Sequence, residues 1–239
     1  MYLEKKMKKT LVVLTVLAVL KMVNATVLVQ DNFDYPNGSL TANTAWTDHS
    51  GTTGQMQVVG GQVSIVDGES EDVNTQFNEV ASGALYAGFD VRITDAGTDE
   101  YFFHFKPSSG YYYRSRLFAI ADGTGYKFAI GYNSGDPQYA TFTNTVFALN
   151  ETYRVVVGVD FDNEESTLSV VGIESGLSAT YTYGVDPMNA VAFRQSGGTG
   201  DALVDNLIVA DNYAEAVPEP MTVALLGLGG LLVNSRRRK

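Results

Sequence analysis

The chain has 239 residues, 45% of them apolar, and a formal net charge of −11 from 16 basic and 27 acidic side chains. This composition supports a buried core and excludes a disordered chain, while the acidic balance argues against a nucleic-acid partner. The absence of cysteine excludes disulfides, Cys-ligated zinc and a Cys nucleophile, and only two histidines argue against a His-rich metal site.

The N-terminus has the three regions of a signal peptide, which we predict over residues 1–25. A basic region at 5–9 precedes a ten-residue apolar run, 11–20, which suits a signal peptide and is short for a membrane span. Val23 and Ala25 suit the −3 and −1 positions, so cleavage is expected after Ala25. A start at Met1 or at Met7 stays open, and the alternative is an N-terminal buried helix or anchor.

The middle of the chain is predicted to be one all-β domain over residues 26–211, a single jelly-roll-like β-sandwich. Apolar and polar residues alternate in short segments, which clusters of Gly, Asn, Asp and Ser separate. A linker is expected at 212–217. The strands named by this pattern are 84–93, 101–106, 111–120, 126–132, 153–161, 167–171, 190–194 and 202–209.

The two ends of this domain resemble a known fold family. The segment DNFDYPNGSL at 31–40, followed by Trp46 and by GGQV at 60–63, is similar to the opening of concanavalin A-like (LamG-like) jelly rolls. VDNLIV at 204–209 is similar to their last strand. The resemblance implies two curved antiparallel sheets with neighbouring chain ends. Members bind glycans or proteins, hydrolyse polysaccharide or act as spacers, so the fold leaves function open.

The resemblance also implies a structural calcium ion near the chain ends. Asp31 and Asp205 lie in the two end motifs, and Asp34 would join them. Carboxylate and carbonyl oxygens are the ligands that calcium prefers. The alternative is that these are solvated residues at strand ends. No other cofactor is expected.

Groups suited to catalysis are few. The E-x-D-x-E pattern of concanavalin-like hydrolases and the G-x-S-x-G elbow of serine hydrolases are both absent. Asp160, Asp162 and Glu164 alternate, but they fall between two predicted strands and are interpreted as a hairpin turn. The alternative is a catalytic or metal-binding role. His104 is expected to face a sheet, and His49 to be solvated in a loop. We therefore predict that the protein is not an enzyme.

An aromatic cluster suggests sugar binding. Tyr111 and Tyr113 would share one face of the predicted strand 111–120. Tyrosine rings stack on sugar rings, and Arg114 or Arg116 would donate hydrogen bonds to hydroxyls. The alternative is that the tyrosines simply pack a β surface.

The C-terminus has three parts in a fixed order. They are a Pro218-Glu219-Pro220 tripeptide, an apolar run at 221–233, and a basic end formed by Arg236, Arg237, Arg238 and Lys239. Thirteen helical residues reach about 20 Å, short of a hydrocarbon core of about 30 Å, so the run predicts a marginal, transient anchor. The basic end would remain in the cytoplasm and act as a membrane stop.

This order of elements resembles a PEP-CTERM sorting signal, here assigned to 218–239 with a short transmembrane segment. The resemblance implies export by the secretion machinery and processing by an exosortase-type membrane enzyme. It also implies a Gram-negative-type bacterium that makes extracellular polysaccharide or a biofilm matrix. The protein would be anchored transiently in the inner membrane and then reach the cell surface or extracellular matrix.

Three functional classes follow. The first is a noncatalytic exported surface or matrix protein associated with exopolysaccharide. The second is a carbohydrate-binding module, and the third is a polysaccharide-active enzyme, which the missing carboxylate motif disfavours. Residues 26–220 retain seven of the basic and 26 of the acidic side chains, a formal charge of −19. Such a charge favours solubility and disfavours contact with anionic lipid.

Overall fold

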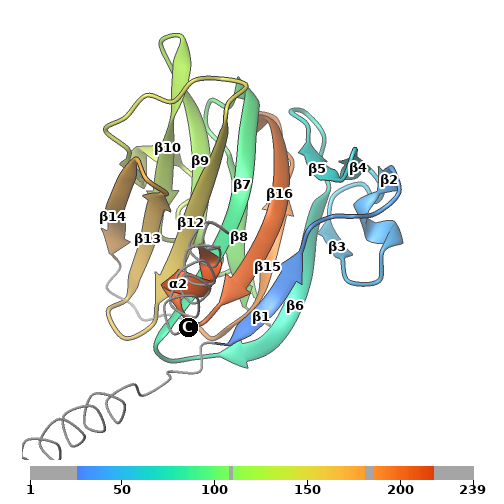
Figure 1. The fold of residues 1–239 in the computed structure, drawn as a ribbon. Helices are drawn as coiled ribbons and strands as arrows, with labels where there is room; N and C mark the ends of the chain where they lie inside the picture. Colours follow the sequence, from blue (N-terminus) through green and yellow to red (C-terminus); the bar gives the residue numbers. More distant parts are fainter. Residues whose placement is uncertain (1–25, 108–109, 181–185, 218–239) are drawn as a thin grey trace, which may run out of the picture.

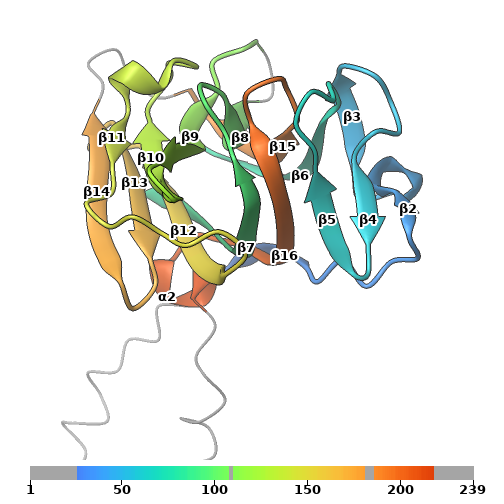
Figure 2. The ribbon, with the colours of Figure 1, turned by 90° about the horizontal axis from the view of Figure 1, so that it is seen from above.

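The computed structural model describes residues 26–107, 110–180 and 186–217, in which two antiparallel β-sheets pack against each other (Figure 1). Seen from above, the sheets form two separate layers (Figure 2). We call the layer that contains β7 the front sheet and the layer that contains β8 the back sheet. The predicted all-β sandwich is confirmed.

The front sheet follows from a period-two apolar pattern. On β7, Leu85, Phe89 and Ile93 are buried, and they face the back sheet because a strand directs alternate side chains to opposite faces. In spatial order the strands are β14 (Glu174–Thr180), β13 (Glu165–Val170), β12 (Thr152–Asp160), β7 (Ala84–Ala96), β16 (Gly200–Ala210), β5 (Gln62–Ile65), β4 (Gln57–Val59) and β2 (Gly38–Ser39), with β1 (Val27–Asp31) also paired to β16.

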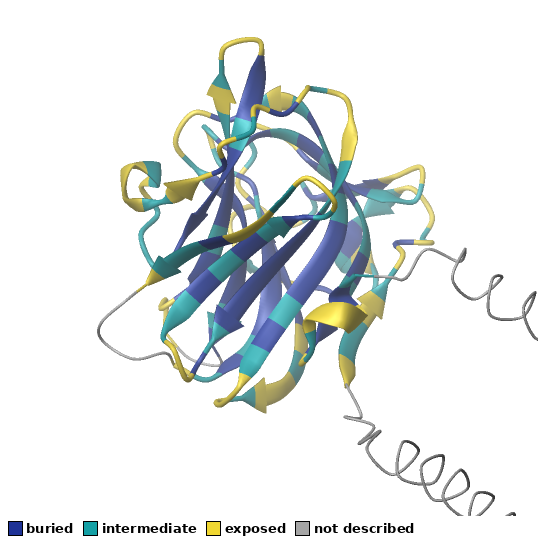
Figure 3. Cartoon of the chain, turned by 60° about the vertical axis from the view of Figure 1, so that its left-hand side comes forward, coloured by how far each residue is buried: buried dark blue, intermediate teal, exposed yellow. Residues whose placement is uncertain are grey.

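The back sheet closes the core from the other side. Phe103, Phe128 and Phe193 are fully buried in the shared apolar cluster, and the buried residues concentrate on the strands (Figure 3). In spatial order the strands are β11 (Thr141–Phe142), β10 (Gly125–Gly131), β9 (Arg114–Asp122), β8 (Tyr101–Pro107), β15 (Met188–Arg194), β6 (Asp72–Val80) and β3 (Thr47–Ser50); the short 3-10 helices are η1 (Leu40–Ala42) and η2 (Pro137–Tyr139).

The first and last strands are neighbours, as the resemblance implied. β1 pairs antiparallel with β16, and Asp31 lies opposite Leu207 in the register. Beyond the strands, the Thr26 amide donates to Asp211 Oδ1 at 2.8 Å, and the Asp211 amide donates to the Thr26 carbonyl at 3.2 Å. The two ends of the sandwich therefore leave it side by side.

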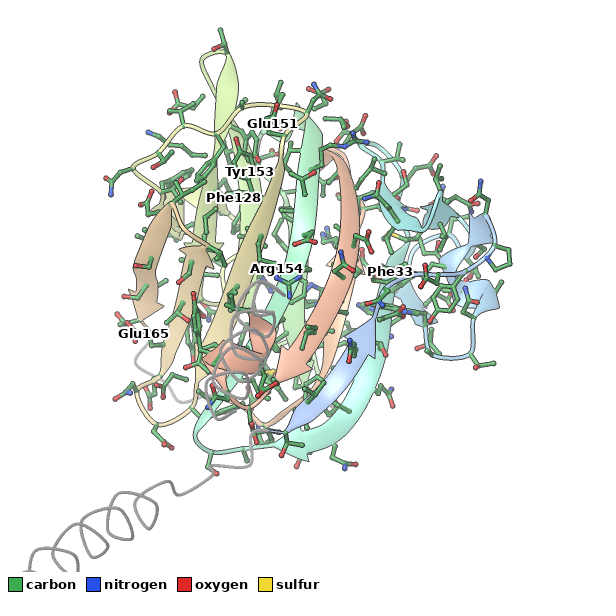
Figure 4. All side chains as sticks on the ribbon, viewed as in Figure 1. Phe33, Phe128, Glu151, Tyr153, Arg154 and Glu165 are labelled. Atoms are coloured by element: carbon green, nitrogen blue, oxygen red, sulfur yellow. The ribbon has the colours of Figure 1, made fainter. Side chains whose placement is uncertain are left out.

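Residues 212–217, expected as a linker, contain the short helix α2 (Tyr213–Ala216). The helix lies on the outer face of the front sheet, where Arg154 also lies (Figure 4). Arg154 Nη2 donates to the carbonyl of Ala216 at 2.8 Å. A Cβ at Gly88 would lie 1.9 Å from the same carbonyl oxygen, so only glycine permits this approach. The chain is therefore fastened to the sandwich up to the start of the C-terminal segment.

The predicted strands are all present with shifted ends, and one shift matters. β9 begins at Arg114, not at residue 111, because its ladder with β8 reaches only from Tyr101 to Phe105 and β8 ends at Pro107. The three tyrosines at 111–113 thus lie before the strand. Strands β1 to β6, β11 and β14 were not predicted, because most of them are short and β6 and β14 are rich in small and polar residues.

The acidic segment at 160–164 forms the predicted hairpin turn between β12 and β13. Asp160 Oδ1 accepts hydrogen bonds from the amides of Asp162 and Asn163 at 3.0 and 2.9 Å. Glu164 has a positive φ of 52°. The Asp160 carboxylate therefore accepts the backbone hydrogen bonds that stabilise this turn.

Candidate functional site

The outer face of the back sheet carries a second apolar cluster, formed by Tyr101, Phe118 and Ala129 and separate from the main core. On β9, Leu117 is part of the main core. Its neighbour Arg116 therefore points to the outer face, since adjacent strand residues face opposite ways. Three strands thus supply an outer surface with both apolar and charged groups.

A cleft of about 550 Å³ opens on this face, a volume within the range of about 300–1,000 Å³ for ligand sites. Strands β8, β9 and β15 contribute to it, and so does the loop that follows β10. Its polar groups come from segments far apart in the sequence. The lining residues are Asp99, Glu100, Tyr101, Arg116, Gly135, Asp136, Pro137 and Arg194.

Arg194 is held by two carboxylates. Its Nη1 donates to Asp72 Oδ2 at 3.0 Å, and its Nε lies 3.4 Å from Glu100 Oε2. Burial acts to lower the pKa of Arg194, but Tyr101 and the two carboxylates reverse the direction, so the pKa is raised. Burial raises the pKa of Asp72 in spite of the neighbouring Arg194. On this side of the cleft, one guanidinium is therefore paired with two carboxylates.

Arg116 differs from Arg194 in its partners. Its guanidinium carbon lies 4.7 Å from the ring centre of Tyr101 and 5.7 Å from that of Tyr113. Within the described ranges, no carboxylate lies in ion-pair distance of Arg116. Burial lowers the pKa of Arg116, and the nearby charges of Arg194 and Arg114 act in the same direction. The cleft therefore contains a desolvated cation without a counter-ion.

The two histidines lie together next to this cleft. The ring centres of His104 and Tyr113 are 4.2 Å apart, and those of His49 and His104 are 6.0 Å apart. Burial lowers the pKa of His49 to about 4 and that of His104 well below its ordinary value. The His104 side chain is buried on the sheet surface, as predicted. His49, expected in a solvated loop, instead lies in β3 and packs against aromatic rings, so that prediction was wrong.

The tyrosines predicted to stack on sugars occupy two different environments. Tyr111 is 84% exposed, whereas Tyr113 is 8% exposed and lies under its neighbours. Their ring centres are 6.3 Å apart in an edge-to-face arrangement. Tyr112 and Tyr139 are also exposed, and Tyr139 ends the 3-10 helix whose first residue lines the cleft. Exposed tyrosines thus lie near the cleft, although Tyr111 and Tyr113 do not share a strand face.

Most acidic groups of the cleft have protein partners. Asp136 accepts a hydrogen bond from the Gln138 amide at 2.9 Å and another from the Gln138 side chain. Asp99 accepts from Thr98 Oγ1 at 2.9 Å. Glu100 faces Arg194. Such carboxylates remain able to accept hydrogen bonds from ligand hydroxyls, since each carboxylate oxygen has more than one lone pair.

The aspartates predicted to bind calcium lie in the region where the chain ends meet. Asp31 accepts hydrogen bonds from the amide of Phe33, the hydroxyl of Tyr35 and the indole N–H of Trp46, each at 2.8 Å. Asp205 Oδ1 accepts from the Asn206 amide at 2.7 Å. Burial raises the pKa of Asp205, and the nearby charges of Asp90 and Asp34 add to this rise.

Within the described ranges, no group of three or more His, Cys, Asp or Glu residues has a spacing that would hold a metal ion. The hydrogen bonds to Asp31 show instead what the opening motif does locally: its carboxylate holds the Phe33, Tyr35 and Trp46 positions in place. The calcium site involving Asp31, Asp34 and Asp205 remains a prediction.

Sequence reasoning missed most of the cleft. It singled out Arg114 and Arg116 but not Tyr101, Glu100 or Arg194. One available signal was the distribution of basic residues in 26–220: five of the seven fall in strands of the back sheet. Those five are Lys106, Arg114, Arg116, Lys127 and Arg194.

Several predictions lie outside the described residues. They are the signal peptide with cleavage at Ala25, the Pro218-Glu219-Pro220 tripeptide, the apolar run at 221–233 and the basic end at 236–239. Among the residues that are described, no helix has the length and apolar character needed to cross a membrane.

Comparison with protein families identifies the C-terminal segment. Residues 216–239 match the PEP-CTERM protein-sorting motif. The match confirms the resemblance seen in the tripeptide, the apolar run and the basic end. No curated protein shows detectable sequence similarity to the chain.

Comparison with solved structures concerns the sandwich. A sialidase aligns over 80% of this chain with 15% identity and a TM-score of 0.56, and this chain spans only 19% of the sialidase's length. The basic winged bean lectin solved with Tn-antigen aligns over 78% of this chain and 97% of its own, with 9% identity and a TM-score of 0.51. At such identities the likeness concerns the fold alone. The chain thus combines a β-sandwich, similar in fold to that of the winged bean lectin, with a C-terminal segment that matches the PEP-CTERM sorting motif.

Proposed function

We propose that this is a noncatalytic, exosortase-sorted protein that binds polysaccharide at the cleft on the outer face of the back sheet. The PEP-CTERM motif marks the chain for export and for recognition by an exosortase. In this proposal the apolar run anchors the protein transiently in the inner membrane. The sandwich then acts at the cell surface or in the extracellular matrix.

The observation that carries the binding proposal is the cleft itself. It combines the Arg116 guanidinium with the carboxylates of Glu100 and Asp136 in one open site, and the buried Tyr101 ring supports Arg116 and Arg194 from below. A few fixed polar groups in a concave site are the usual means of orienting a bound small molecule or sugar. The likeness to a lectin in fold is consistent with this use.

The proposal that the protein is noncatalytic rests on the partners of the carboxylates in the cleft. Glycoside hydrolysis uses one free acid and one nucleophile or base. Glu100 is paired with Arg194, and Asp136 accepts two hydrogen bonds from Gln138. The pairings support a role in holding a ligand.

A polysaccharide-active enzyme is the second candidate, because Asp99, Glu100 and Asp136 line the same cleft. The two functions separate in one experiment. The purified full chain is incubated with neutral and acidic oligosaccharides while binding is followed by calorimetry and chain length by mass spectrometry. Binding without shortening supports the proposal, shortening supports the enzyme, and neither result with any glycan would overturn both.

A further inference from the structure

In the part of the chain that the structure describes, most basic side chains of the sandwich are paired with carboxylates, and Arg116 is not. Residues 26–220 carry 26 acidic side chains against seven basic ones, and within the described ranges four of the seven form ion pairs, namely Arg114, Lys127, Arg154 and Arg194. Arg114 pairs with Asp186 at 3.1 Å, and Lys127 pairs with Asp122 at 2.9 Å. Arg116 lies in the same sheet and has no such partner within the described ranges. Its position in the cleft therefore favours a counter-ion from outside the chain.

The absence of a carboxylate partner for Arg116 among the described residues carries a free-energy cost, because the guanidinium is largely removed from water. A cation taken out of water without a partner loses hydration free energy that no ion pair replaces. Arg114 and Arg194 add like charge. The rings of Tyr101 and Tyr113 recover part of the cost through cation–π attraction. A bound anion would recover more.

The geometry suits a carboxylate. Aromatic rings lie against the guanidinium of Arg116, and its in-plane N–H groups match the two oxygens of a carboxylate. The loop after β10 approaches this group closely, since a Cβ at Gly135 would lie 3.2 Å from Arg116 Nη1. Glycine at this position keeps the space beside the guanidinium open.

The acidic residues of the cleft reduce the range of anions that can bind there. Asp99, Glu100 and Asp136 repel any anion in this cleft, and they repel a doubly charged phosphate or sulfate more strongly than a singly charged carboxylate. A sugar acid has one carboxylate and several hydroxyl donors, so it satisfies both kinds of group at once. Resting on the proposed function, we propose that the cleft binds an acidic polysaccharide through a uronic acid residue whose carboxylate pairs with Arg116.

The test compares Arg116→Gln with Arg92→Gln in the full chain. Arg92 lies on β7 of the opposite sheet, so its substitution removes the same charge away from the cleft. The probes are hexasaccharides of galacturonic, mannuronic, guluronic and glucuronic acid, each also as its methyl ester, with neutral glucan and sulfated glucan hexasaccharides. Binding is measured by calorimetry at two salt concentrations.

We expect at least one uronate to bind at least tenfold more tightly than its methyl ester and the sulfated glucan. Arg116→Gln should abolish that preference, Arg92→Gln should leave it intact, and Arg116→Lys should restore it in part. The melting temperature of Arg116→Gln should not fall, because the substitution removes an unpaired charge. If Arg116 only stabilised the fold, the Arg116→Gln substitution would lower the melting temperature.

Four outcomes would overturn the inference. Equal binding of acid and ester, or equal losses in the two glutamine variants, would exclude Arg116 as a carboxylate site while leaving glycan binding in place. Binding of the sulfated glucan alone would show a different anion. Binding of no glycan at all would overturn the proposed function together with the inference.

Discussion

Asp31 is the residue on which the opening motif depends. Its carboxylate is the common acceptor for the Phe33 amide, the Tyr35 hydroxyl and the Trp46 indole. Trp46 in turn stacks on Phe193 of the back sheet with ring centres 5.5 Å apart. Burial and the neighbouring Asp31 raise the pKa of Tyr35 to about 12, so the hydroxyl remains a donor at physiological pH.

Asp31→Ala should therefore destabilise the sandwich. An orphaned buried donor costs about 1–3 kcal/mol, and we expect a loss of about 2 kcal/mol or more in the free energy of unfolding, measured by urea denaturation. Asp162→Ala is the control, because Asp162 is exposed in a turn, and its change should stay within about 0.5 kcal/mol. Equal effects in the two variants would contradict the role given to Asp31.

Calcium binding near the chain ends has its own test. A ligand at a hundredfold excess over its dissociation constant stabilises the folded state by about 2.7 kcal/mol. If Asp31, Asp34 and Asp205 bind calcium, the melting temperature should rise with calcium and fall with chelator, and Asp205→Asn should reduce the response. A melting temperature that neither treatment changes would exclude the site.

The histidines predict a loss of stability in acid. Burial lowers the pKa of His49 to about 4; Lys106 and Arg194 add to the lowering, and Asp48 opposes it. Burial also lowers the pKa of His104 well below its ordinary value. The unfolded chain takes up these protons near pH 6.5, so the histidine contribution to stability is complete above about pH 6.5 and is lost as pH falls toward 4. Melting temperatures measured between pH 7.5 and 4 should decline.

The His49→Gln variant separates this effect from other acid-sensitive groups. Asp72 has a raised pKa and acts with the opposite sign, since its protonation favours the folded state. The variant should show a shallower decline between pH 6.5 and 4 than the natural chain. Parallel curves for the two proteins would show that His49 does not contribute.

At the scale of elements, the contact between β7 and α2 explains a glycine in the middle of a strand. Gly88 lies where the carbonyl of Ala216 approaches the front sheet, and Arg154 donates to that carbonyl from β12. Arg154 Nη1 also donates to the Asn206 carbonyl at 2.7 Å. One buried guanidinium therefore joins β12, β16 and α2.

Gly88→Ala should release α2 from the sheet, because the added Cβ would overlap the Ala216 carbonyl. We expect faster proteolysis near residues 213–217 and a melting temperature lower by a few degrees, with a folded sandwich by circular dichroism. Gly197→Ala is the matched control, since a Cβ there has no atom within 4 Å. Unchanged proteolysis in Gly88→Ala would contradict the contact.

At the scale of the whole molecule, we expect the sandwich and the sorting segment to act independently. Within the described residues, the contacts of the sandwich include Val217, and the Pro218-Glu219-Pro220 tripeptide follows directly in the sequence. Processing and folding should therefore respond to different substitutions.

Deletion of 218–239 should release a folded, unanchored protein, and Glu219→Ala should leave an unprocessed membrane form. The physical reason is that the basic end resists translocation, at a cost of about 2.5–3.5 kcal/mol per residue on insertion scales. Membrane and medium fractions of the native host are compared, with mass spectrometry of the C-terminus. The same distribution for the natural chain and both variants would exclude the sorting role.

Local patterns were enough for part of this picture. Alternation on 84–93 and 153–161 predicted the central strands of the front sheet, since a half-buried strand must alternate. The acids at 160–164 were assigned to a turn from position alone. His49 was misassigned because its burial comes from His104 and Tyr113, which are distant in the sequence.

The sequence by itself determined the C-terminal sorting motif and the all-β class, because both depend on the order and periodicity of neighbouring residues. Only the tertiary structure determined which residues form the cleft. Asp72, Glu100, Arg116, Asp136 and Arg194 come from five separate segments, and antiparallel pairing of β6, β15, β8, β9 and β10 brings those segments together. That register determines that Arg194 has carboxylate partners and that Arg116 has none within the described ranges. Neighbouring residues in the sequence do not determine these pairings.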